Sequence, residues 1–150
     1  MTTDLEKILG TIAERKANRG QRIQPPCRPS ELDKLRGDLW NAYRMNVPQS
    51  YEELLGRMNG IDFNGTLVFA ASTVPHANRQ GEFIEGLIDA NKIRQVNAEY
   101  LVIFGESGME MYVFDLRSQQ WAVVDQVSLD VFEQCGDFDQ LMVAALAKRL

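Results

Sequence analysis

The sequence predicts an α+β domain in which a run of antiparallel strands is accompanied by helices. Three observations indicate this class. Three short β-rich runs follow one another between residues 100 and 125, and amphipathic helical patterns precede and follow them. The chain has 150 residues, of which 45% are hydrophobic and 25% charged. This is the size and composition of one globular domain, so we expect residues 1–150 to fold as a single unit.

The strand-rich part begins with the apolar run of residues 100–104. Residues 105–108 contain two glycines, which tolerate positive φ and so favour a turn. A partly alternating run at 109–115 follows, then polar residues at 117–120 and a last apolar run at 121–125. Short β-rich runs joined by polar turns predict an antiparallel meander.

The first helix is predicted to begin at Thr3, because Thr3 and Glu6 have the spacing of a capping box. Its apolar residues fall on one helical face: Leu5, Ile8, Leu9 and Ile12. We expect the helix to end before Gly20 and a stiff, basic loop with prolines to follow over residues 20–29. Residues 1–28 are therefore a predicted N-terminal helical extension of the domain.

Two more helices are predicted before residue 61. The first starts near Pro29 and carries the apolar stripe Leu32, Leu35, Leu39, Trp40 and Tyr43. Pro48 interrupts the helical pattern. The next helix is predicted from a second capping box, formed by Ser50 and Glu53, and from an Asn-Gly stop at residues 59–60.

The segment between these helices and the meander is less regular. A turn at residues 64–65 precedes a predicted strand over residues 66–71. An irregular stretch over residues 72–81 contains His76, the single histidine of the chain. Apolar residues at helical spacing then predict a helix over residues 82–91.

After the meander, residues 126–136 have no clear pattern, and a short helical turn starting at Ser128 is the predicted structure there. Asp137 and Gln140 are three residues apart. This is the spacing at which the side chain of an N-cap residue accepts a hydrogen bond from a backbone N–H, so the pair predicts the start of a final helix. The inward face of that helix is predicted to hold Phe138, Leu141, Met142, Ala145 and Leu146.

Charge is distributed unevenly along the chain, whose net charge is −5. Residues 14–28 carry one acid and five bases, whereas residues 99–140 carry nine acids and one base. The net acidity argues against direct nucleic-acid binding, and the acidic half would attract a basic partner. A solvated surface without a partner is the simpler alternative.

Several function classes are not favoured by the sequence. The two cysteines, Cys27 and Cys135, are far apart, which suits a reducing cytoplasm better than secretion. The N-terminus lacks the features of a signal peptide, and no run is long enough to span a membrane. One histidine and two scattered cysteines do not form a zinc motif. We expect neither a metal nor a cofactor.

Catalytic chemistry is not indicated either. A nucleophile needs a nearby base, and the candidate arrangements combine His76 with Ser72 in the irregular segment, or with Cys27 or Cys135. We do not expect an enzyme. A small hydrolase or transferase that uses Ser72 or His76 stays open as an alternative, and the competing interpretation of His76 is a surface loop residue.

Three motifs occur in order along the chain. The first is Val-Pro-Gln-Ser-Tyr-Glu-Glu-Leu-Leu at residues 47–55, which leads to Asn-Gly at 59–60. The second is Phe-Gly-Glu-Ser-Gly at residues 104–108, followed by a run that ends at Phe-Asp. The third is Asp-Phe-Asp-Gln-Leu at residues 137–141. In this order, the motifs resemble those of the SUKH superfamily. The long N-terminal helix and basic loop depart from the common pattern and suggest a divergent member.

The resemblance implies a curved antiparallel or mixed sheet with flanking helices, and a role in binding proteins. Members of the superfamily are largely immunity proteins that neutralise toxin domains, often nucleases, and a fungal branch regulates cell-wall assembly through protein partners. We therefore expect a toxin-neutralising protein, with an intracellular regulatory scaffold as the alternative. The residues predicted to bind a basic partner are Glu106, Glu110, Asp115 and Asp125.

Overall fold

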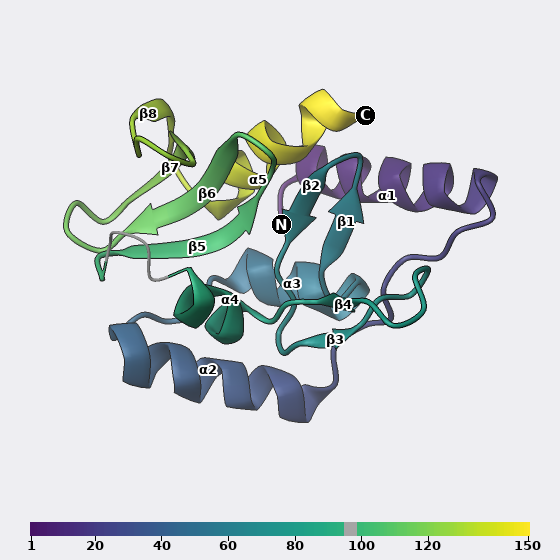
Figure 1. The fold of residues 1–150 in the computed structure, drawn as a ribbon, viewed down its shortest axis with the longest axis horizontal. Helices are drawn as coiled ribbons and strands as arrows, with labels where there is room; N and C mark the ends of the chain where they lie inside the picture. Colours follow the sequence, from purple (N-terminus) through teal and green to yellow (C-terminus); the bar gives the residue numbers. More distant parts are fainter. Residues whose placement is uncertain (95–98) are drawn as a thin grey trace.

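The computed structural model describes residues 1–94 and 99–150 and confirms the α+β class. Within these residues, a six-stranded antiparallel sheet has the strand order β1-β2-β5-β6-β7-β8, and a separate two-stranded sheet pairs β3 with β4. Helices flank the larger sheet, with α1, α3 and α5 on one side and α4 on the other, where α2 lies beyond α4 (Figure 1). Within the same residues, no helix has the length and apolarity needed to cross a membrane.

The elements have the following bounds. The helices are α1 (Thr3–Asn18), α2 (Pro29–Tyr43), α3 (Gln49–Arg57), α4 (Leu87–Ile93) and α5 (Phe138–Leu146), with the 3₁₀ turn η1 (Ala147–Arg149) at the end. The strands are β1 (Ile61–Phe63), β2 (Thr66–Val68), β3 (Val74–Pro75), β4 (Phe83–Ile84), β5 (Leu101–Glu106), β6 (Glu110–Asp115), β7 (Gln120–Asp125) and β8 (Val131–Cys135).

The predicted three-stranded meander is confirmed as β5, β6 and β7. Ile103 lies opposite Val113, and Val113 lies opposite Ala122, so the three strands are in register across their centres. Both faces of the meander are largely buried, because α5 covers one and α4 covers part of the other. The apolar runs of the sequence therefore correspond to strands covered on two sides.

An aromatic cluster joins the sheet to the helices on the α5 side. The ring of Phe104 on β5 lies 5.2 Å from Tyr51 of α3, 5.7 Å from Phe138 of α5 and 5.2 Å from Trp121 of β7, measured between centroids. Edge-to-face and tilted pairs at these distances add to the stability gained from burial alone. The motif residues of the sequence therefore meet in the core.

Helix α1 belongs to the same hydrophobic core. Leu5, Leu9 and Ile12 are fully buried and pack in one cluster with the residues of the sheet. The helix begins at Thr3 as predicted, but its N-cap is Thr2 and not Thr3, because the side chain of Thr2 accepts the N–H of Leu5. The segment described from the sequence as an extension thus supplies one apolar face of the domain.

The region around the Asn-Gly motifs contains a hairpin that the sequence did not predict. Residues 61–63 form β1, which pairs with β2 across a turn where Asn64 and Gly65 have φ values of 47° and 86°. The strand predicted over residues 66–71 ends at Val68. Helix α3 begins at Gln49, directly after Pro48, so Ser50 lies within the helix and the predicted capping box is absent.

The helix predicted over residues 82–91 begins only at Leu87. The N–H of Ala70 donates to Glu85 and the N–H of Leu87 donates to Ala70, so the backbone before α4 pairs with a distant strand end. Gly86 is required at this contact, because a Cβ atom there would lie 2.6 Å from the backbone of Ser72. This tertiary pairing outweighs the local helical spacing.

The segment after the meander was also mispredicted. Residues 126–128 form a single turn, in which the N–H of Leu129 donates to Asp125. Leu129 has a φ of 65°, which a continuing helix does not allow. The chain then enters β8, whose register skips Phe132 between the pairs Val123–Glu133 and Val124–Val131.

Candidate protein-binding site

The four carboxylates predicted to bind a partner do not share one surface. Glu110 and Asp125 lie opposite each other on β6 and β7, and their side chains point to the α5 side of the sheet. Glu106 lies opposite Met111, the neighbour of Glu110, so its side chain points to the other side. Asp115 shares the side of Glu106 but lies at the far end of β6.

Three of these carboxylates are paired with basic side chains of the same chain. Glu106 accepts from Arg94 at 2.6 Å, Glu110 from Lys148 and Asp115 from Arg117 at 3.4 Å. Their side chains are 16%, 16% and 21% exposed, respectively. Burial would raise the pKa of Asp115, but hydrogen bonds from Arg117 and Ser118 outweigh it and lower that pKa. Little of this negative charge is available to a partner.

Asp125 holds the turn between β7 and β8. Its carboxylate accepts the backbone N–H groups of Val127 and Ser128, both at 2.8 Å. These hydrogen bonds, that from Ser128 first, lower the pKa of Asp125, so the group stays ionised. Within the described residues, no cation pairs with Asp125.

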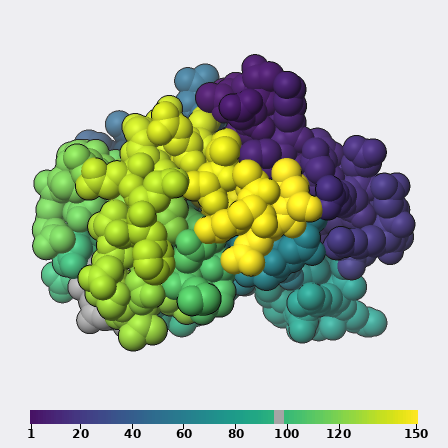
Figure 2. Space-filling view, turned by 90° about the horizontal axis from the view of Figure 1, so that it is seen from above, coloured from purple at the N-terminus to yellow at the C-terminus, as the bar shows by residue number. Residues whose placement is uncertain are grey.

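A continuous acidic segment surrounds Asp125. We call residues 125–135, which comprise the turn and β8, the acidic edge; they carry three acids (Asp125, Asp130 and Glu133) and no Lys or Arg. These acids belong to the acidic half that was recognised in the sequence, but the sequence did not predict that two of them flank or lie on a strand. Asp130 and Glu133 are exposed, and no ion pair within the described part of the chain involves either. Figure 2 shows this yellow-green segment uncovered on one face of the molecule.

Exposed apolar side chains occur on the same segment. Val127, Val131 and Phe132 are 85%, 54% and 56% exposed. Met109, also exposed, lies beside the turn, because its carbonyl accepts the N–H of Gln126 at 2.9 Å. An apolar group rimmed by charges is typical of a protein-binding surface. The acidic edge thus combines uncompensated charge with accessible apolar area.

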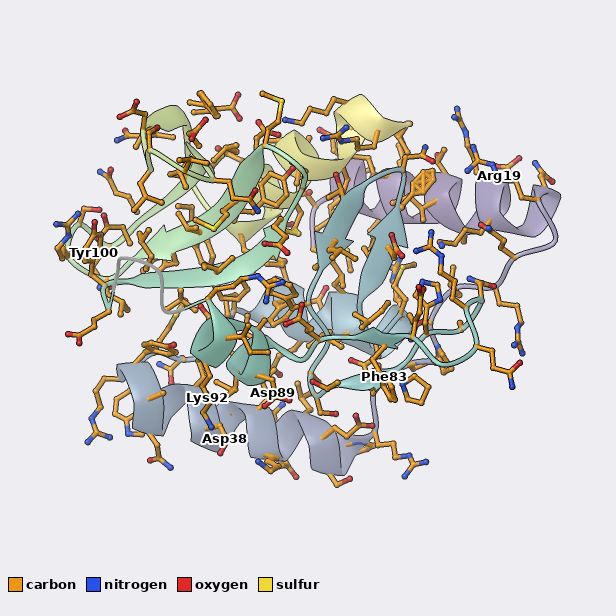
Figure 3. All side chains as sticks on the ribbon, viewed as in Figure 1. Arg19, Asp38, Phe83, Asp89, Lys92 and Tyr100 are labelled. Carbon is orange, nitrogen blue, oxygen red and sulfur yellow. The ribbon has the colours of Figure 1, made fainter. Side chains whose placement is uncertain are left out.

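A concave surface lies on the opposite side of the sheet, between α4, the end of α2 and β5. The cavity has a volume of about 1100 Å³. Among the described residues, its lining includes Tyr43, Lys92, Arg94, Tyr100 and Glu106. Figure 3 shows Lys92 and Asp89 on the side of α4 that faces Asp38 of α2, and Tyr100 apart from them at the end of the larger sheet.

Two charged groups of this concave surface, Arg94 and Glu106, are already engaged. Arg94 makes paired contacts with Glu85 and Glu106, each with a closest distance of 2.6 Å, and its guanidinium lies 5.0 Å from the ring centroid of Phe69. Hydrogen bonds from Arg94 to Glu85, and then to Glu106, raise the pKa of Arg94. A network satisfied in this way holds α4 against the sheet and leaves little of the charge of Arg94, Glu85 and Glu106 for a ligand.

His76 is buried, contrary to the surface position expected from its loop. Its side chain is 6% exposed. Nδ1 accepts the backbone N–H groups of Asn78 and Arg79 at 3.0 and 3.1 Å, so Nε2 carries the proton and donates to Asp62 at 2.9 Å. Ser72 is not its partner, since the Ser72 hydroxyl donates to Glu31. The ring connects the loop to β1, and neither nitrogen is available as a base.

The basic segment of residues 14–28 is used largely for internal contacts. Lys16 is buried and donates to the carbonyl of Asp62 at 2.8 Å. Its burial lowers its pKa. Arg19 donates to Asn64 and Arg22 to the carbonyl of Ala77. These bonds attach α1 and the following loop to the β1–β2 hairpin and to the His76 loop.

Neither a protein-family model nor a curated protein matches the sequence. The resemblance to the SUKH superfamily therefore stays a prediction, supported by the motifs alone. The geometry can be interpreted without it. Within residues 1–94 and 99–150, the acidic edge combines exposed charge, exposed apolar side chains and an edge of the six-stranded sheet.

Proposed function

We propose that this chain is a non-enzymatic protein-binding module that neutralises a basic toxin domain, such as a nuclease, in the manner of SUKH immunity proteins. The observation that carries the proposal is the acidic edge, whose three carboxylates have no Lys or Arg beside them in residues 118–147. A surface of one sign attracts a partner of the other sign and speeds their encounter.

The other predicted carboxylates form ion pairs within the chain, and this limits where a basic partner would make contact. Glu106, Glu110 and Asp115 are each bound to a cation, so a partner would have to displace that cation. Asp130 and Glu133 need no such exchange. We therefore place the contact with a basic partner at the acidic edge, with Asp125 at its start.

A second candidate is an intracellular regulatory scaffold that binds an endogenous protein through apolar contacts. The exposure of Val131 and Phe132 favours it. Ionic strength separates the two candidates, because screening weakens attraction between exposed charges and leaves apolar contacts largely unchanged.

The test begins with the tagged chain, recovered from its own cells at low salt and washed again at high salt. For toxin neutralisation we expect a single stoichiometric basic partner that is lost at high salt. The association rate of that partner is then measured with the double variant Asp130→Lys/Glu133→Lys. We expect its association at low salt to slow by at least about tenfold.

A matched control changes the same number of charges elsewhere. Glu14 of α1 and Glu82 before β4 are exposed and lie outside the acidic edge, so Glu14→Lys/Glu82→Lys produces the same net charge. An equal slowing in both double variants would show that only net charge matters and would remove the acidic edge from the proposal. A salt-resistant partner would favour the scaffold.

A further inference from the structure

We propose that the acidic edge binds an extended, basic segment of a protein as an additional strand beside β8. This inference rests on the proposed function and specifies how the partner is held. Strand β8 is the last strand of the six-stranded sheet. An open edge offers unpaired backbone N–H and C=O groups, which an extended peptide can satisfy while its alternate side chains read the surface.

The hydrogen bonds of β7 establish which of its groups face β8. The N–H of Asp125 donates to the carbonyl of Asp130 at 2.8 Å, whereas the N–H of Gln126 donates to the carbonyl of Met109 at 2.9 Å. Backbone groups of successive residues point to opposite sides of a strand. Odd-numbered residues of β7 therefore bond toward β8, and even-numbered ones bond toward β6.

It follows which groups of β8 point outward. Gln134 lies opposite Ala122, and Val131 lies opposite Val124. Since Ala122 and Val124 bond toward β6, these two pairs do not exchange hydrogen bonds. The N–H and C=O of Val131 and of Gln134 therefore face away from the sheet, and both residues are exposed.

The opposite edge of the sheet is less accessible. The side chain of Lys16 in α1 donates to the backbone carbonyl of Asp62 in β1 at 2.8 Å. The guanidinium of Arg19 lies 5.8 Å from the ring centroid of Phe63. Side chains of α1 thus cover β1, whereas within the described residues no element covers the outer side of β8.

Charge identifies the kind of strand that fits. Glu133 shares the face of Val123, on the α5 side, while Val131 and Gln134 share the other face, with Val124 and Ala122. A strand with basic side chains on the first face and apolar side chains on the second would meet Glu133 and Val131. The partner is therefore a segment in which basic and apolar residues alternate.

A second copy of this chain is a poorer occupant. Antiparallel pairing of two β8 strands would bring the Asp130 and Glu133 groups of both copies together, with no Lys or Arg in the acidic edge to offset them. Like charges on adjacent strands are destabilising. The extra residue Phe132 also interrupts the regular register, which hinders indiscriminate pairing at an edge.

The test uses the full chain and a short synthetic peptide of alternating Lys and Val, with the affinity measured by titration calorimetry. Amide hydrogen exchange is followed by NMR. We expect the exchange of the Val131 and Gln134 amides to slow by at least about tenfold on binding, because new hydrogen bonds protect them. The same peptide N-methylated at every other residue keeps its side chains but loses the N–H donors along one edge, and with the edge that faces β8 blocked it should bind at least tenfold more weakly.

A pair of variants tests the backbone of β8 directly. Gln134→Pro removes the outward N–H, and an edge strand tolerates proline at such a position, whereas Gln134→Ala keeps the N–H. We expect the proline variant to bind the peptide about tenfold more weakly than the alanine variant. Far-UV circular dichroism confirms that both variants are folded.

The outcomes separate this inference from the proposed function. If Asp130→Lys/Glu133→Lys weakens peptide binding but Gln134→Pro does not, strand addition is wrong and charge-led binding stands. If neither variant weakens binding, or if the peptide does not bind, the acidic edge is not the binding site, and both proposals are wrong about its role. Sedimentation that shows a dimer disrupted by Gln134→Pro would assign the edge to a second copy instead.

Discussion

The side chain of Asn91 substitutes for a missing strand beside β5, and its replacement tests how the concave side of the sheet is built. Strand β2 pairs with β5 only at Gly105 and Glu106, so among residues 1–94 and 99–150 no strand lies next to Ile103 on that side. Asn91 of α4 accepts the N–H of Ile103 at 2.8 Å and donates to its carbonyl at 2.9 Å. All of these groups are buried.

The expected cost of Asn91→Leu follows from these two hydrogen bonds. Leucine has a similar size but leaves the N–H and the C=O of Ile103 buried without partners. Each such group costs about 1–3 kcal/mol, so together they cost about 2–6 kcal/mol. The additional apolar burial offsets about 1–2 kcal/mol. We expect the free energy of unfolding to fall by about 3 kcal/mol, a large part of the total for a typical domain.

Urea unfolding measures this loss, as a lower midpoint with an unchanged slope. Asn41→Leu is the matched control, because Asn41 is exposed on α2. An exposed substitution of this kind should change stability by no more than about 0.5 kcal/mol. A loss below about 1 kcal/mol in Asn91→Leu would refute the strand-substitute role of Asn91.

Three further predictions concern the core. Tyr51→Phe removes a buried hydroxyl that donates to a backbone carbonyl at 2.7 Å, so thermal unfolding should show a loss of about 1–2 kcal/mol. Gly105→Ala would place Cβ 2.3 Å from the Leu67 carbonyl and should cost about 3 kcal/mol, whereas Gly108→Ala, with open space around it, should not. Burial raises the pKa of Cys135 to about 11. At pH 8 its thiol should therefore react with iodoacetamide more slowly in the native than in the urea-unfolded chain. Because the folded state favours the protonated thiol, its contribution to stability is full below about pH 9 and is lost toward pH 11.

The parts of the fold that the sequence predicted are those with local signals. The meander was predictable because its apolar runs are long, lie close together and are separated by turn residues. Strand β1 has three residues and β8 is exposed over four of its five positions, so neither gives a periodic pattern of buried apolar residues.

The segment before α4 shows the opposite failure, a local signal that tertiary contacts overrule. Helical spacing is shared by the apolar residues Phe83, Ile84, Leu87 and Ile88. However, Phe83 is exposed on β4, and the helix does not begin until Leu87. The deciding contact is the pairing with Ala70. A residue so distant in the sequence leaves no trace in the local pattern.

The candidate site was predictable in charge but not in geometry. Counting residues correctly located the acidic half of the chain. It did not reveal that Arg94 and Lys148, one before the meander and one after it, pair with Glu106 and Glu110. Ion pairs between distant segments depend on the fold, so the sequence overestimated the free charge at those positions.

The same pairing explains why the remaining charge matters. Once Glu106, Glu110 and Asp115 are bound to cations, the negative charge of this half concentrates where no cation is near, at the acidic edge. An open strand with exposed valine and phenylalanine would invite self-association. Repulsion between the carboxylates of two copies opposes that self-association, and the same carboxylates attract a strand that carries positive charge. The features that keep the edge from pairing with itself are thus the features that would select a basic partner.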